Sequence, residues 1–314
     1  MEPAPRRAFP RWLATILVMG VILGMLAGPS LHRRDRPPQA SPEALAAPIL
    51  NPENSEPPPP HHRLRIMTYN IQHGADAYGR VDLTQTTEAI GRFAPDILFL
   101  AEVDQGWRRS GFVDQPAELA RSLGMPYVHF APALTTRSIV HTSPGTTARY
   151  GNLFLSKLPV KESGAVALPR KGANEPRNVL WIDVEFAGQT IRVFGTHLSV
   201  DGSERVQQFR ALADLIAASP HPAVVLGDLN SPPSRLKDEA PYLGSPPWHD
   251  AHVVLGQGDG FTFPSPSPRS RIDYIFVHAS LLPQLVSTTV VQSAASDHLP
   301  IFVELSPKPR MAQH

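Results

Sequence analysis

The sequence contains no cysteine, which excludes disulfide bonds, thiolate zinc sites and cysteine nucleophiles. A metal bound by this chain must therefore be held by oxygen or imidazole ligands. Net charge is also nearly absent, because 29 Lys+Arg and 28 Asp+Glu give +1 over 314 residues. With 42% hydrophobic and 18% charged residues, the composition excludes a wholly disordered chain, a multi-span membrane protein and a strongly basic nucleic-acid-binding protein.

A single long uncharged run lies near the N-terminus. It extends over 20 residues from Trp12 to Leu31 and follows Arg6, Arg7 and Arg11. A positive flank followed by an apolar run of about bilayer length is typical of an export signal or a signal anchor. We expect residues 1–32 to form a hydrophobic helix retained as a membrane anchor; a cleaved signal peptide and a buried core helix are the alternatives.

Proline is abundant, and it is concentrated after this run. Nine of the 35 prolines lie within the 24 positions from Pro37 to Pro60. This density predicts an extended Pro-rich linker over residues 33–62. The first 62 residues hold six arginines and five acidic residues, so 23 charges of each sign remain in the rest of the chain. We therefore expect a neutral globular domain over residues 63–308 and a short C-terminal tail at 309–314.

Short apolar runs and amphipathic stretches alternate along this domain. Their patterns predict three helices, at residues 84–93, 116–123 and 203–217. They also predict strands, at residues 63–70, 96–102, 152–156, 178–186, 190–197, 223–228, 272–278, 283–292 and 300–305. Strands outnumber helices, so two sheets packed face to face with helices outside fit the pattern better than one doubly wound sheet.

Polar side chains stand at the ends of many predicted strands. An apolar strand that ends in a carboxylate, amide or imidazole group places a ligand at the rim of a sheet. Taken singly, each has a structural explanation; Gly-Asp-x-Asn-Ser, for example, is a common turn. Several such signals in one neutral domain favour a shared site instead. The candidates are Asn70, Glu102, His197, Asp228, Asn230, Asp273, Asp297 and His298.

By contrast, we expect Trp107, Arg108 and Arg109 to be exposed loop residues.

The blocks around these candidates resemble a known family. They read TYNIQHG, LFLAEVD, GNLFLSKLPV, FGTHLS, VVLGDLNSPP, RIDYIFV and SDHLPIFVEL, in that order. From residue 63 to about 305, the chain resembles the endonuclease/exonuclease/phosphatase superfamily of metal-dependent phosphoesterases, which includes DNases, inositol polyphosphate 5-phosphatases and neutral sphingomyelinases. The resemblance implies an α/β fold, a four-layer sandwich of two packed mixed β-sheets flanked by helices, with the active site at one rim.

The resemblance also implies roles for individual residues. A divalent metal, Mg²⁺ or Mn²⁺, is expected at Glu102, with Asn70 and Asp297 nearby. The expected catalytic residues are His298 with Asp273 to orient it, Asp228 and Asn230 to position water and phosphate, and His197 to assist phosphate binding or protonate the leaving group. The expected phosphate contacts are Asn152, Tyr150 and Arg177. Whether Asp228 or His298 is the general base stays open at this point.

The sequence therefore predicts a metal-dependent hydrolase that cleaves phosphate esters by in-line attack of water. The neutral domain and the predicted membrane anchor favour a lipid head group or a small phosphoester outside the cytoplasm, because a duplex-DNA nuclease usually presents a basic surface. An exported Mg²⁺-dependent nuclease is the alternative with the same catalytic residues. A catalytically inactive, tethered binding module is the alternative of a different class.

Overall fold

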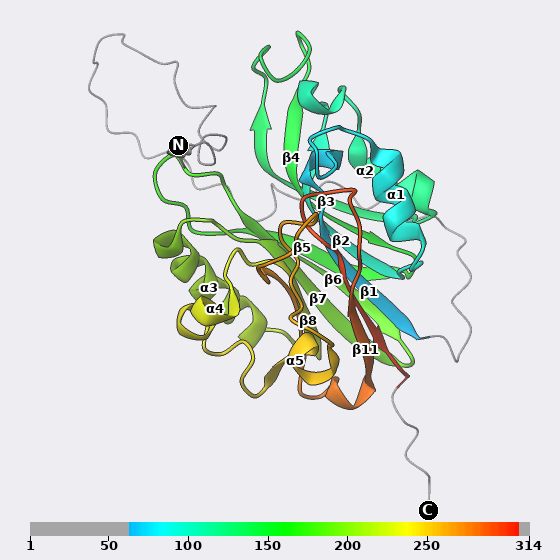
Figure 1. Cartoon of the computed structure of the whole chain (residues 1–314), viewed down its shortest axis with the longest axis vertical. Coiled ribbons are helices and arrows are strands. Elements are labelled where there is room, and N and C mark those ends of the chain that lie inside the picture. Colours follow the sequence, from blue (N-terminus) through cyan, green and yellow to red (C-terminus); the bar gives the residue numbers. More distant parts are fainter. Residues whose placement is uncertain (1–62, 308–314) are drawn as a thin grey trace, which may run out of the picture. The chain divides into compact units, whose positions relative to one another are not determined.

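The computed structural model describes residues 63–307 (Figure 1). The predicted hydrophobic helix (1–32), Pro-rich linker (33–62) and C-terminal tail (309–314) lie outside the described residues, and they stay predictions. Among residues 63–307, no helix combines the length and the apolar character needed to cross a bilayer.

Twelve strands form two six-stranded sheets. The first has the order β11 (Leu285–Val290), β12 (Ile301–Leu305), β1 (Leu64–Asn70), β2 (Ile97–Gln105), β4 (Ala148–Ser156) and β3 (Tyr127–Thr136). The second has the order β5 (Val160–Ala167), β6 (Asn178–Phe186), β7 (Gln189–His197), β8 (Ala223–Asp228), β10 (Asp273–His278) and β9 (Trp248–Asp250). Both sheets are mixed, because β1–β2 and β7–β8 are parallel pairs and their other neighbours are antiparallel.

Helices lie on the outer faces of the two sheets (Figure 1). Residues from α1 (Leu83–Gly91) and α2 (Gln115–Leu123) pack in one hydrophobic cluster with the first sheet. Residues from α3 (Gly202–Ala217) and α4 (Pro233–Glu239) pack in another with the second sheet, and the short α5 (Ala251–Leu255) follows β9. Asp82, Asp114 and Asp201 cap α1, α2 and α3 by accepting backbone N–H groups, which explains why these helices begin where they do.

The hydrophobic pattern of β2 shows how the layers form. Ile97 and Phe99 point into the cluster between the sheets, whereas Leu98 and Leu100 point into the cluster that includes α1 and α2. Successive side chains of a strand face opposite sides, so a continuous apolar run buries both faces. The layers are therefore helix, sheet, sheet, helix, and the predicted four-layer α/β sandwich is confirmed.

All nine predicted strands and all three predicted helices are present. The strands at 178–186 and 223–228 have the predicted bounds, and the ends of the other elements are shifted. The prediction missed β3, β5, β9, α4 and α5. The strands β3, β5 and β9 lie at sheet edges. Edge strands carry more polar residues than central ones, as in the Val-Lys-Glu-Ser start of β5, so their apolar pattern is weak. The helices α4 and α5 span only seven and five residues, too few to show a helical period.

The strand directions bring the polar strand ends to one rim. β1 ends at Asn70 and, in the second sheet, the parallel strands β7 and β8 end at His197 and Asp228, which are register partners. β10 is antiparallel to β8 and begins at the same level, where Asp273 is the register partner of Asp228. β12 is antiparallel to β1, so the segment before it, which carries His298, reaches the same rim.

The two sheets approach each other closely at Gly195 of β7. A Cβ atom built on Gly195 would lie 2.2 Å from Cδ2 of Phe99 in the opposite sheet. Phe99 also packs against Phe154, with ring centroids 5.1 Å apart. Glycine at 195 therefore allows an aromatic layer between the sheets.

We expect Gly195→Ala to lower the free energy of unfolding by about 1–3 kcal/mol, because the added methyl group must displace a packed ring. The measurement is urea denaturation followed by circular dichroism. Gly91→Ala is the matched control, since a Cβ placed there would meet nothing within 4 Å beyond its own helix, and alanine favours a helix. Equal stability of the two variants would contradict this account of the packing.

Candidate active site

The side-chain amide of Asn70 connects the two sheets at the rim. Its Nδ2 donates to Oε1 of Glu102 at 2.9 Å and to Oδ2 of Asp228 at 3.1 Å. Its Oδ1 accepts the backbone N–H of Gln72 at 3.1 Å. Asn70 and Glu102 come from the first sheet and Asp228 from the second, so one amide holds a carboxylate of each sheet. Its role as a metal ligand stays a prediction.

Glu102 stands on a β-bulge. Its φ of 61° lies in the left-handed region, and the register between β2 and β4 shifts between Leu100 and Val103. A bulge redirects a side chain out of the strand alternation, at a cost of about 1 kcal/mol or more for a residue other than glycine. Burial raises the pKa of Glu102, and the nearby charges of Asp297 and Glu175 raise it further. The hydrogen bond from Asn70 and the charge of His298 oppose this rise. The grouping of acidic side chains around Glu102 suits a cation ligand.

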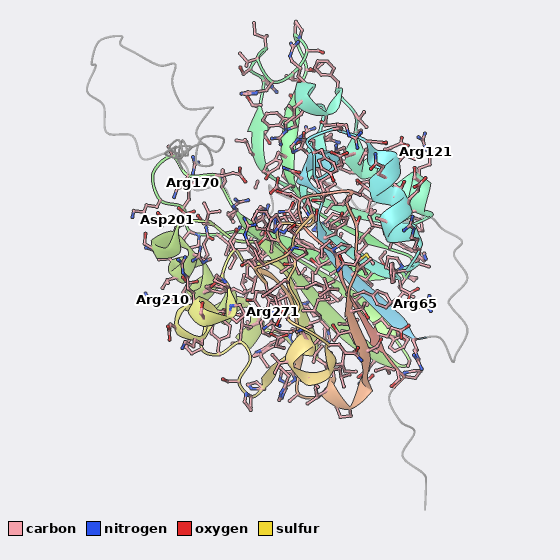
Figure 2. The ribbon with its side chains drawn as sticks, viewed as in Figure 1. Arg65, Arg121, Arg170, Asp201, Arg210 and Arg271 are labelled. Atoms are coloured by element: carbon pink, nitrogen blue, oxygen red, sulfur yellow. The ribbon has the colours of Figure 1, made fainter. Side chains whose placement is uncertain are left out.

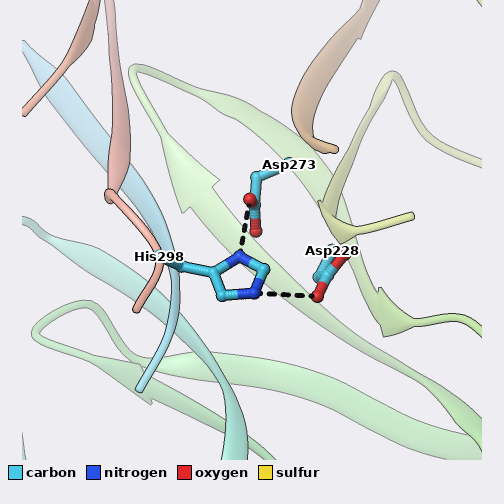
Figure 3. Close-up of side chains that lie close together, drawn as sticks. All are labelled: Asp228, Asp273 and His298. Atoms are coloured by element: carbon cyan, nitrogen blue, oxygen red, sulfur yellow. Dashed lines mark hydrogen bonds and ion pairs between the residues drawn. The ribbon is translucent and has the colours of Figure 1, made fainter. Parts of the chain in front are cut away.

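His298 lies between two aspartates of the second sheet (Figure 3). Its Nδ1 is 2.9 Å from Oδ2 of Asp273, and its Nε2 is 3.7 Å from Oδ2 of Asp228. Burial alone would lower the pKa of His298, but Asp273 and Asp228 outweigh it and raise the pKa to about 10. Burial and the charge of Asp273 raise the pKa of Asp228 to about 7. The ring of Phe263 packs against His298, with centroids 4.9 Å apart.

His197 is a second buried histidine, and its tautomer follows from its neighbours. Arg177 Nη1 lies 2.9 Å from Nδ1 of His197. Because guanidinium groups only donate, Nδ1 must accept and the proton must be on Nε2. That Nε2 faces Oδ2 of Asp228 at 3.4 Å. Burial lowers the pKa of His197 far below its usual value, and Arg177 lowers it further, so the ring is neutral.

Arg177 retains unused donor capacity. Its side chain is 10% exposed, and its Nη1 forms an ion pair with Oε1 of Glu175 at 2.6 Å. Its Nε is buried and has no hydrogen-bond partner among the described residues. An unsatisfied guanidinium N–H at this rim suits an anionic ligand.

The turn after β8 forms both a structural motif and part of the site. Asn230 has a φ of 49° and donates its backbone N–H to Oδ1 of Asp228 at 2.9 Å. Its Nδ2 donates to the carbonyl oxygen of Leu198 at 2.9 Å. The turn explanation of Gly-Asp-x-Asn-Ser is therefore correct, and the turn itself places Asp228 and Asn230 together, as the functional explanation requires.

The predicted phosphate contacts on β4 lie beside this network rather than in it. Asn152 is buried and donates through Nδ2 to Oδ1 of Asn178 at 2.9 Å. Tyr150 is also buried, and the charges of Glu102 and Glu175 add to burial in raising its pKa well above the usual value. No hydrogen bond within residues 63–307 joins either residue to the histidines or to Asp228.

Asp297 is partly exposed and precedes His298 directly. Its charge raises the pKa of both Glu102 and His298. Two sets of side chains therefore fit a divalent cation by their oxygen-rich chemistry. One is the predicted set around Glu102 and Asp297. The other is Asp228, Asp273 and His298, whose ligand atoms lie within 4.8 Å of one another, and a cation there would require His298 to lose a ring proton.

Sequence reasoning missed several supporting residues. Asn178 starts β6 opposite Asn152, and its only sequence signal is a polar residue at the start of an apolar strand. Trp107 was expected to be exposed, but this is wrong: it is buried, and its Nε1 donates to the carbonyl oxygen of Arg149 at 2.7 Å. Arg109 is exposed, as expected, yet it forms two hydrogen bonds with the buried Asp104. These contacts join segments distant in sequence, so no local pattern predicts them.

Comparisons with known proteins point to the same family. The family model "Endonuclease/Exonuclease/phosphatase family" matches residues 67–298. No curated protein sequence matches the chain. An endonuclease/exonuclease/phosphatase from Beutenbergia cavernae DSM 12333 is 25% identical, with a TM-score of 0.64 over 78% of this chain and 72% of that one.

Two solved structures with more specific titles share the fold. The mannosyl-6-phosphatase Bt3783 from Bacteroides thetaiotaomicron VPI-5482 is 19% identical, with a TM-score of 0.57 over 77% of this chain and 99% of that one. D. rerio TDP2 complexed with a single-strand DNA product is 18% identical, with a TM-score of 0.53 over 77% of this chain and 98% of that one. Since the family model covers most of the described domain, including both histidines and all the aspartates of the rim, the chain belongs to the endonuclease/exonuclease/phosphatase family.

Proposed function

We propose that this protein is a divalent-metal-dependent phosphoesterase that hydrolyses a phosphate ester by in-line attack of water. The observation that carries the proposal is the continuous network at the rim. It runs from Glu102 through Asn70 to Asp228, and from there to both histidines. A buried group of carboxylates beside a histidine–aspartate pair has no evident structural purpose, since such a group is costly to bury.

The side chains that would hold the cation are Glu102 and Asp297, with Asn70 adjacent to them. Their oxygen-rich chemistry suits Mg²⁺ or Mn²⁺. When bound, such a cation neutralises charge on the phosphoryl oxygens and orients the ester.

The remaining roles belong to the chain's own residues. Arg177, Asn152 and Tyr150 bind the phosphoryl oxygens; the free Nε of Arg177 supports this assignment. Asp228 and Asn230 orient the attacking water, and the water proton passes to the Asp228–His298 pair, whose Oδ2 and Nε2 are 3.7 Å apart. Asp273 holds His298 in one orientation through Nδ1. The Nε2–H of the neutral His197, 3.4 Å from Oδ2 of Asp228, donates a hydrogen bond to the phosphate or to the leaving oxygen.

We expect Glu102→Gln, Asp228→Asn and His298→Ala each to lower turnover of bis(p-nitrophenyl) phosphate with Mg²⁺ by about two orders of magnitude or more. EDTA should abolish the activity of the unmodified protein. Glu162→Gln is the matched control, because the Glu162 side chain is 72% exposed on the edge strand β5.

Near-normal turnover in any one of the three variants would remove that residue from the assignment. If the unmodified protein neither hydrolysed this ester nor bound Mg²⁺ in calorimetry, the inactive binding module would replace the enzyme.

For the substrate, we propose a lipid head group or a small phosphoester. Glu175 supports this choice, because its carboxylate lies against Arg177 and reduces the positive charge available to a long polyanion such as nucleic acid. Exposed apolar side chains at the rim support it too, since Val200 follows the His197 strand and Ile139 lies in the loop before β4. Two observations favour the alternative, an exported nuclease. Arginines lie near the loop that carries Ile139, and the fold is similar to that of TDP2 with its DNA product.

We expect faster hydrolysis of sphingomyelin, phosphatidylinositol phosphates or soluble inositol phosphates than of plasmid or abasic DNA. The panel is run with Mg²⁺ and again with EDTA, using His298→Ala as the inactive control to exclude a contaminating enzyme. Rapid nicking of plasmid without turnover of any lipid or small ester would assign the nuclease function instead.

For location, we propose a single-pass membrane protein whose catalytic domain lies outside the cytoplasm. The support is the arginine-flanked apolar run from Trp12 to Leu31 followed by the Pro-rich linker. We expect the full chain to remain in the membrane fraction after an alkaline carbonate wash, and its domain to be digested by protease added to spheroplasts. A mature N-terminus near residue 28, with release from membranes, would favour a cleaved signal peptide instead.

A further inference from the structure

The strands β3 and β4 continue beyond the rest of their sheet as a hairpin, seen at the top of Figure 1. The loop after β2 packs against this hairpin. Arg108 donates its backbone N–H to the carbonyl oxygen of His141 at 2.7 Å and its Nη2 to that of Ile139 at 2.9 Å. Thr142 Oγ1 donates to the carbonyl oxygen of Gly106 at 2.9 Å. Residues 105–114 and 134–149 therefore form one ordered projection, which we call the arginine ridge.

The outer surface of the arginine ridge is apolar at its tip. Ile139 and Val140 are 66% and 69% exposed, and Phe112 is 43% exposed. Aliphatic side chains exposed side by side in this way are unfavourable in water, and contiguous ones mark a surface that contacts something apolar. Figure 2 shows the side chains of this hairpin standing clear of the remaining elements.

Positive charge surrounds these apolar side chains. The arginine ridge carries four exposed arginines, Arg108, Arg109, Arg137 and Arg149, against one acidic residue, Asp114. Arg109 is also paired with Asp104, which lies just before the ridge, so the local excess is two positive charges. Residues 63–314 carry 23 positive and 23 negative residues, so the excess is local. Apolar tips surrounded by cationic side chains match the interface of an anionic membrane, where the former enter the acyl boundary and the latter meet the phosphates.

The ridge is also joined to the candidate active site. Arg109 lies over the rings of Trp107 and Tyr150, at 5.0 and 5.1 Å from their centroids. Tyr150 in turn is close enough to Glu102 for that carboxylate to raise its pKa. A surface held by the ridge would therefore lie beside the catalytic rim.

We propose that the arginine ridge is a membrane-docking element that inserts Ile139 and Val140 into the interface of an anionic bilayer. This inference rests on the proposed function, which supplies the choice of a lipid surface. It adds the part of the domain that contacts that surface. A nucleic-acid strand would use the arginines, but Ile139 and Val140 present no aromatic face on which unpaired bases could stack. A membrane interface therefore accounts better for both features.

The experiment uses the full chain, which has no cysteine, so Ile139→Cys creates one site for the environment-sensitive fluorophore NBD. The protein is mixed with vesicles of phosphatidylcholine alone or of equal parts phosphatidylcholine and phosphatidylglycerol. We expect a blue shift and brighter emission with the anionic vesicles only, reversed by high salt. Val253→Cys, labelled in the same way, is the matched control, because Val253 is 74% exposed on α5 and should not respond.

Adding Arg137→Gln to the Ile139→Cys protein should weaken the anionic response about fivefold. Circular dichroism and the unfolding midpoint verify that each labelled variant is folded. The readout needs no hydrolysis, so loss of docking and loss of catalysis are separate results. No response at position 139, equal responses at 139 and 253, or a response at 139 to single-stranded DNA and not to vesicles would overturn the proposal.

Discussion

The candidate active site depends on the side-chain amide of Asn70, which donates hydrogen bonds to one carboxylate of each sheet. Asn70 ends a strand of the first sheet and donates to Glu102 and to Asp228. Without this donor, the two carboxylates would face each other across the rim with only repulsion between them. The close packing of the sheets below, where Phe99 lies against Gly195, sets the separation that lets one amide reach both.

Around Asn70, the carboxylates outnumber the cationic side chains. Asp273 and Asp228 keep His298 protonated, whereas burial and the neighbouring Arg177 keep His197 neutral. Two histidines in one buried site thus hold opposite protonation states because their partners differ. Burial raises the pKa of Glu102, and the acidic neighbours Asp297 and Glu175 add to the rise, so this part of the rim suits a divalent metal.

The candidate active site and the arginine ridge are both built on strands β2 and β4. The bulge at Glu102 turns that carboxylate to the rim, and three residues later the same strand leads into the loop that holds the hairpin. Tyr150 on β4 lies between the two regions, in contact with Arg109 on one side and under the charge of Glu102 on the other. A surface bound by the ridge and an ester held at the rim would therefore be positioned by the same pair of strands.

The sequence by itself determined the positions of the central strands along the chain, the polar residues at their ends and the family. It could do so because buried strands leave near-continuous apolar runs and their terminal residues follow at once. It did not predict the edge strands β3, β5 and β9, whose solvent-facing positions dilute that pattern. Only the tertiary structure decided that Asn70 bridges the sheets, that Trp107 is buried and that Arg177 fixes the tautomer of His197. Each of these contacts joins residues from separate strands or loops, and such distances in space depend on how the sheets pack, which no local pattern encodes.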